Sequence, residues 1–118
     1  MKLNLETIRT ILSERFKNGY HSLKDIPPPH ELYGSVKAAQ KIASAIKDGK
    51  KITLIGDYDV DGVTSTSLVK LFFDQIPYPL TTIIPNRFSD GYGLSVKILE
   101  RVSADLIITV DNGINAIE

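Results

Sequence analysis

The chain has 118 residues, which is long enough for one domain with a true hydrophobic core. Its 14 Lys and Arg residues balance 14 Asp and Glu residues, which argues against a dedicated nucleic-acid coat protein, because such surfaces are strongly basic. The sequence contains no Cys, no apolar run that could span a bilayer and no signal-peptide pattern after Met1. We therefore expect a cytoplasmic protein that makes no membrane contact and has neither disulfides nor thiolate metal ligands.

The first thirty residues predict a helix followed by a connector. Asn4 can cap a helix of about three turns. The apolar face of this helix is formed by residues three or four positions apart, namely Leu5, Ile8, Leu12 and Phe16. Asn18-Gly19 is expected to end the helix, and residues 20–30, with prolines at 27, 28 and 29, are expected to be extended. Residues 1–30 therefore predict an N-terminal helix and a Pro-rich connector.

Residues 31–118 alternate between helical and strand patterns. Helical spacing of apolar residues predicts helices over 31–47, 63–76 and 94–102. Short apolar runs predict strands over 51–56, 81–84 and 105–110. Because strands and helices alternate, we predict an α/β fold in which a helical lead-in precedes a β-α-β-α-β parallel sheet flanked by helices.

Three carboxylates follow the first predicted strand at every second position: Asp57, Asp59 and Asp61. An extended backbone would place all three on one side of the chain. Charges so close together repel one another unless a cation or a proton lies among them, and Mg²⁺ or Mn²⁺ suits oxygen ligands. The alternative, an acidic surface turn that caps the next helix, requires only one Asp.

Polar residues also follow the other two predicted strands. Asn86 and Arg87 come after the second strand, and Asp111 and Asn112 come after the third. In a parallel sheet the carboxyl ends of the strands meet at one edge, where ligands bind. The sequence therefore predicts that three loops converge on one site, although Arg87 could equally be an ordinary surface arginine.

Two enzyme-like or ligand-binding alternatives fit part of the acidic stretch. Residues 59–64 (DVDGVT) look like the nucleophile motif of haloacid-dehalogenase-type phosphatases, with Asp59 as nucleophile, Asp61 as general acid/base and Thr109 in a second motif. That interpretation leaves Asp57 unexplained. An EF-hand loop fails because its twelfth position is Leu68 rather than a bidentate Glu.

A non-catalytic alternative is a receiver-like binding module, with an acidic pair after the first strand and Asp111 as the phosphate acceptor. The later strands of that pattern, with their Thr or Ser and Lys residues, are not found in these 118 residues. This alternative is kept as the third hypothesis, after the phosphatase.

The fullest match involves three motifs in order: residues 56–65 (GDYDVDGVTS), residues 84–94 (IPNRFSDGYGL) and residues 110–113 (VDNG). Together they closely resemble the RecJ family of bacterial single-strand-specific DNA exonucleases, within the DHH phosphoesterase superfamily. The resemblance covers residues 51–118. It implies that residues 31–118 are the N-terminal part of a DHH domain and that the enzyme hydrolyses single-stranded DNA in the 5′→3′ direction during DNA repair and recombination.

The resemblance also implies a two-metal site for Mn²⁺ or Mg²⁺. Asp57 and Asp59 match the family's first metal-binding motif and Asp111 matches its second, so these three are the expected catalytic and metal-binding residues. Asp61 and Asn112 are expected to orient the turns or to act through the ligands rather than to bind metal.

The loop after the second strand is expected to contact the single-stranded DNA. Arg87 fits a bidentate phosphate contact, and Tyr92 could stack on a base. Gly91 and Gly93 would allow the backbone to approach the substrate closely, and Asn86 belongs to the same motif. Protein partners cannot be named from these residues.

One departure from the family pattern is large. The Asp-His-His triplet that names the superfamily is not in these 118 residues, and both histidines, His21 and His30, precede the predicted sheet. We therefore expect the sequence to be an N-terminal fragment of a longer enzyme, with an incomplete two-metal site and little or no nuclease activity of its own.

Overall fold

The computed structural model describes residues 4–15, 17, 23–91 and 93–114. The chain divides into two compact units, Met1–Val36 and Lys37–Glu118. None of the helices in the described ranges combines the length and the apolar character that a membrane span requires.

In the first unit, helix α1 (Leu5–Arg15) begins where the sequence predicts. The side-chain oxygen of Asn4 accepts hydrogen bonds from the backbone N–H of Thr7 at 2.7 Å and from its hydroxyl at 2.8 Å. The predicted cap is therefore confirmed. No described residue of α1 is buried. Phe16, predicted on the apolar face, and the expected helix end at Asn18-Gly19 lie outside the described residues.

The Pro-rich connector is not fully extended, so that prediction was wrong in part. Two short 3₁₀ turns interrupt it, η1 (Leu23–Asp25) and η2 (Pro29–Glu31). Proline is compatible with the first position of a helical turn, because its missing N–H has no partner there anyway. Gly34 then adopts a left-handed conformation with φ of 78°. The following helix therefore begins at Ser35 rather than at residue 31.

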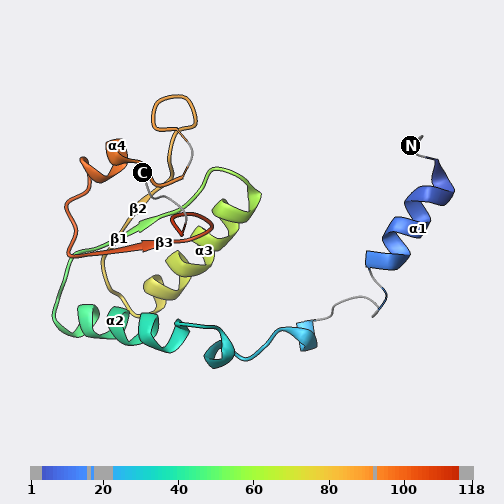
Figure 1. Ribbon diagram of the computed structural model, residues 1–118. Helices are drawn as coiled ribbons and strands as arrows, with labels where there is room; N and C mark the ends of the chain where they lie inside the picture. Colours follow the sequence, from blue (N-terminus) through green and yellow to red (C-terminus); the bar gives the residue numbers. More distant parts are fainter. Residues whose placement is uncertain (1–3, 16, 18–22, 92, 115–118) are drawn as a thin grey trace. The chain divides into compact units, whose positions relative to one another are not determined.

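The second unit is built on a three-stranded parallel sheet (Figure 1). Its strands are β1 (Ile52–Ile55), β2 (Leu80–Ile83) and β3 (Leu106–Thr109), in the spatial order β2-β1-β3. In register, Ile52 pairs with Leu80 on one side and with Leu106 on the other. The predicted α/β fold with a parallel sheet is confirmed.

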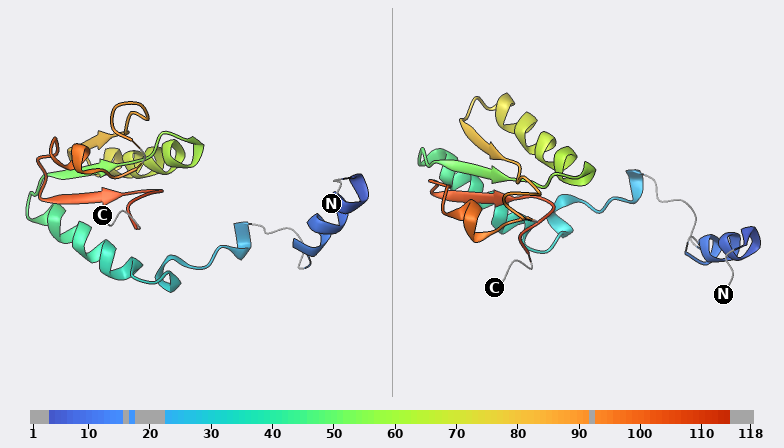
Figure 2. Two further views of the ribbon diagram at one scale, coloured as in Figure 1. Left: turned by 45° about the horizontal axis from the view of Figure 1, so that its top comes forward. Right: turned by 90° about the horizontal axis from the view of Figure 1, so that it is seen from above.

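Helices α2 (Ser35–Lys47) and α3 (Val60–Gln75) lie on one face of this sheet, and the short helix α4 (Val96–Leu99) lies on the other (Figure 1, Figure 2). Strand β1 lies between β2 and β3, so the connection from β1 to β2 and the connection from β2 to β3 cross the sheet in opposite directions. Right-handed connections that run in opposite directions lie on opposite faces of the sheet. Helix α4 is shorter than predicted, since the N–H groups of Arg101 and Val102 bond three residues back and tighten the chain into a turn.

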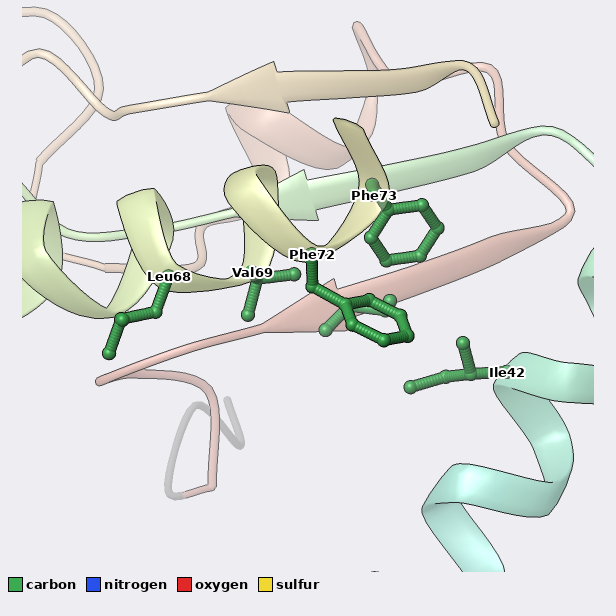
Figure 3. A pocket seen from close by; sticks show the side chains of 6 residues that line it. Ile42, Leu68, Val69, Phe72 and Phe73 are labelled. Carbon is green, nitrogen blue, oxygen red and sulfur yellow. The ribbon is translucent and has the colours of Figure 1, made fainter. Parts of the chain in front are cut away.

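The core lies between the sheet and the two helices α2 and α3. Phe73 of α3 is 1% exposed and packs with Ala45 and Ile52. An apolar hollow of about 290 Å³ lies beside this core, lined by side chains of α2, α3 and β3 (Figure 3). No titratable group lines it, so it does not have the groups that catalysis would require.

Replacing Phe73 by Ala should lower the free energy of unfolding by about 3–5 kcal/mol, because it empties a fully buried position. Its neighbour Phe72, which is 53% exposed, provides a matched control, and Phe72→Ala should cost no more than about 1 kcal/mol. Urea denaturation followed by circular dichroism measures both. Equal losses for the two variants would show that the packing described for Phe73 is wrong.

Candidate metal centre

The loops that follow the three strands lie at the same edge of the sheet, because the strands are parallel. The segment from Gly56 to Asp59 connects β1 to α3, and residues 110–113 follow β3. The N–H of Val110 donates to the carbonyl of Ile55 at 3.1 Å, so the sheet pairing of β1 and β3 extends to the start of these loops. The two acidic loops are therefore held side by side.

Asp57 is a fully buried carboxylate, with 0% of its surface exposed. Its Oδ1 accepts a hydrogen bond from the N–H of Tyr58 at 2.7 Å. Its Oδ2 is also buried but has no hydrogen-bond partner among the described residues. A buried carboxylate oxygen without a partner is costly, and this oxygen is therefore suited to hold a cation.

Gly62 allows the first turn of α3 to pack directly on Asp57. A Cβ at this position would lie 2.5 Å from the Cβ of Asp57 and 2.6 Å from its carbonyl carbon. No side chain fits at that distance. The glycine therefore lets α3 start close to the carboxylate.

Asp59 is the N-cap of α3. Its backbone is extended, and its Oδ1 accepts a hydrogen bond from the N–H of Gly62 at 2.9 Å. Helix α3 begins at Val60, three residues earlier than predicted, and this early start places Asp61 in its first turn. The expectation that extended backbone carries Asp57, Asp59 and Asp61 to one side was therefore wrong.

Asp111 reaches the same site through a left-handed backbone, with φ of 60°. Asp and Asn adopt this conformation more readily than other residues with side chains. The next residue, Asn112, donates from Nδ2 to the carbonyl of Val110 at 2.9 Å and to that of Ile55 at 3.5 Å. Asn112 thus ties the loop after β3 to the end of β1.

One oxygen from each of Asp57, Asp59 and Asp111 lies within 4.8 Å of the others. Partial desolvation raises the pKa of the exposed Asp111 carboxyl group, and repulsion from Asp59, Asp61 and Asp57 raises it further. Three carboxylates at this separation favour a bound divalent cation, for which oxygen ligands are suited. The buried, unpartnered oxygen of Asp57 fits the same cation, so the residues present are compatible with a metal site.

The loop after β2 brings Arg87 to the edge of this site. The guanidinium carbon of Arg87 lies 5.6 Å from the centre of the Tyr58 ring, and Tyr58 is the residue next to Asp57. This is within the range of a cation–π contact. Sequence reasoning did not single out Tyr58, because its contact depends on how two separate loops fold.

Other predicted substrate-binding residues shape the loop. The Oδ1 of Asn86 accepts hydrogen bonds from the N–H groups of Phe88 at 2.9 Å and Ser89 at 3.4 Å, so this oxygen is engaged within the loop. Gly91 is exposed, with φ of 86°. Gly93 is buried, and a Cβ there would lie 3.3 Å from the Cβ of Asn112. Tyr92 lies outside the described residues.

Residues 51–118 match the family model described as "DHH family, N-terminal domain". The chain is 37% identical over 101 residues to the single-stranded-DNA-specific exonuclease RecJ of Haemophilus influenzae, covering 82% of this chain and 18% of that protein. It is 40% identical over 96 residues to the RecJ of Bacillus subtilis, covering 79% of this chain and 12% of that protein. The chain thus spans less than a fifth of the length of these relatives.

A crystal structure of exonuclease RecJ bound to manganese is also similar, with 34% sequence identity and a TM-score of 0.63. The match covers 68% of this chain and 21% of that one. The resemblance inferred from the three motifs is therefore confirmed. The phosphatase and receiver alternatives are not favoured by these similarities.

The repulsion at Asp111 predicts an unusual effect on stability. Its pKa in the folded chain is raised above 3.8, so protonation of Asp111 stabilises the folded state relative to the unfolded state. This stabilisation is lost as the pH rises through the raised pKa. In chelator-treated protein at pH 7, Asp111→Asn should therefore raise the melting temperature, since Asn keeps the left-handed backbone and removes the charge. The difference should shrink toward pH 4.

Thermal denaturation followed by circular dichroism at several pH values tests this expectation. A lower melting temperature for Asp111→Asn in metal-free buffer at pH 7 would contradict the account of charge repulsion. Asp74→Asn, on the exposed end of α3, is a suitable control for the loss of one acidic charge away from the site.

Proposed function

Because the chain belongs to the DHH family, we propose that it supplies the first part of the active site of a metal-dependent exonuclease acting on single-stranded DNA. The observation that carries this proposal is the cluster of Asp57, Asp59 and Asp111, whose oxygens lie within 4.8 Å of one another. The proposal is also supported by the similar proteins, which are single-stranded-DNA-specific exonucleases.

In this proposal the three carboxylates are the catalytic and metal-binding residues of a two-metal site for Mn²⁺ or Mg²⁺. The manganese in the similar RecJ structure supports Mn²⁺ as one ion of this kind. When bound, such ions lower the pKa of an attacking water and neutralise charge on the phosphoryl oxygens. The chain's own contribution is to hold the ligands: Asp57 from the end of β1, Asp59 from the cap of α3, and Asp111 from the loop after β3.

The substrate would lie across the loop after β2. Arg87 is exposed, lies against the ring of Tyr58 next to Asp57, and can donate to a phosphate in a bidentate manner. Asn86, Gly91, Tyr92 and Gly93 complete the proposed substrate-binding loop. Asp61 and Asn112 would act indirectly, through the charge near Asp111 and the tie between the two acidic loops.

The wider role that we propose is hydrolysis from the 5′ end during DNA repair and recombination in the cytoplasm. Support for it comes from the relatives' specificity for single-stranded DNA. Because the 118 residues contain no Asp-His-His triplet, we expect little nuclease activity from them alone.

Metal binding can be measured on the 118-residue chain itself. Mn²⁺ titration followed by electron paramagnetic resonance should show binding that weakens at least about tenfold in Asp59→Asn, since even the loss of a ligand's hydrogen-bond partner costs about 10–100-fold. Asn preserves the cap of α3, so this variant removes only the ligand charge. Unchanged affinity in Asp59→Asn, with Asp74→Asn as the control, would exclude Asp59 as a ligand.

Activity is tested on the whole gene product that contains this sequence. With Mn²⁺, we expect it to release nucleotides from 5′-phosphorylated single-stranded DNA and to leave the same DNA in duplex form and a small aryl phosphate unchanged. Asp59→Asn and Asp111→Asn should each abolish this release. Turnover of the aryl phosphate with the DNA intact would instead favour a phosphatase in which Asp59 is the nucleophile.

A further inference from the structure

The loop after β2 is closed on itself by Asp90. The N–H of Asn86 donates to Oδ2 of Asp90 at 2.9 Å, and the N–H of Asp90 donates to the carbonyl of Asn86 at 2.8 Å. These two bonds run in opposite directions between the same two residues. They fix the start and the end of residues 86–90 together, with Arg87 inside the closed loop.

Asp90 is in turn held by a residue outside the loop. Its Oδ1 lies 2.8 Å from Nη2 of Arg101, two residues after α4, and the side chain of Asp90 is only 9% exposed. The hydrogen bond from the Asn86 N–H lowers the pKa of Asp90, and the bond from Arg101 lowers it further, against the opposing effect of burial. Asp90 therefore stays ionised and keeps both bonds at neutral pH.

The closed loop contacts the segment that contains Asp57 through Arg87. The Arg87 guanidinium lies against the ring of Tyr58, and the N–H of Tyr58 donates to Oδ1 of Asp57. A continuous series of contacts thus connects Arg101, through Asp90 and the loop, to the buried carboxylate. An arginine on an unrestrained loop would lose much more conformational freedom on binding a phosphate than one that is already held in place.

We propose that Asp90, held by Arg101, is a positioning residue that keeps Arg87 against Tyr58, the residue next to Asp57, for binding a substrate phosphate. This inference rests on the proposed function and deepens it, because it assigns a role to the ion pair between Asp90, inside the loop after β2, and Arg101, outside the three motifs. Asp90 itself does not touch the substrate. Its effect reaches the DNA only through Arg87.

The test uses the whole gene product with Mn²⁺ and a 5′-phosphorylated single-stranded oligonucleotide. Asp90→Ala should raise KM by about tenfold and change kcat by less than about twofold, since a contact equal in ground state and transition state affects KM alone. Arg87→Ala should have a similar effect. The double variant should be no worse than Arg87→Ala, because Asp90 acts through Arg87.

Asp90→Asn and Asp74→Ala are the matched controls. The Asn side chain keeps an oxygen that can accept from Asn86, so it should recover much of the loss in KM. Asp74→Ala breaks an exposed ion pair with Lys70 on α3 and should leave KM unchanged. An unchanged KM in Asp90→Ala, or losses that multiply in the double variant, would overturn the inference while leaving the nuclease function intact.

A second measurement decides the inference independently of activity. In the 118-residue chain, the Nε–H resonance of Arg87 should carry a ring-current shift from Tyr58 that disappears in Asp90→Ala and persists in Asp74→Ala. Persistence of the shift in Asp90→Ala would overturn the positioning role. A wild-type gene product that releases no nucleotides from single-stranded DNA would refute the proposed function instead, whatever the resonance shows.

Discussion

Repulsion among three carboxylates is the constraint on which the arrangement of this site depends. Asp57 is buried just after the central strand, one of its oxygens has no hydrogen-bond partner in the described part of the chain, and Asp59 and Asp111 lie close to it. The burial of Asp57 and the closeness of the three negative charges both destabilise the folded chain when no cation is bound. The sheet maintains it because β1 is hydrogen-bonded on both sides, so the loops that follow β1 and β3 cannot move apart without breaking the ladder.

The three carboxylates reach the site by different backbone geometries. Asp57 lies two residues after the end of β1, Asp59 caps a helix, and Asp111 has a left-handed backbone conformation. Each position restricts the residue type for a reason of its own, such as the cap hydrogen bond at Asp59. The same side chains therefore satisfy local backbone requirements and place their oxygens together.

Much of this could be predicted from the sequence, because alternating apolar segments and the residues after each strand are local signals. The three strands were predicted to within about one residue at each end, and the convergence of their loops followed from parallel pairing. The start of α3 was misplaced because Asp59 was interpreted as part of an extended run rather than as a cap. The contacts of Arg87 with Tyr58 and of Asp90 with Arg101 could not be predicted, since each joins segments whose approach is set only by tertiary packing.

Gly62 shows how closely the helix and the site depend on each other. Glycine within a helix is about 1 kcal/mol less favourable than alanine, so helix propensity alone would favour Gly62→Ala as a stabilising substitution. A methyl group there would meet the backbone of Asp57 at 2.6 Å, and the helix could accept it only by moving away from the carboxylate. A substitution at Gly62 in the first turn of α3 therefore requires a compensating change at Asp57, just after β1, whether it is made in the laboratory or arises during evolution.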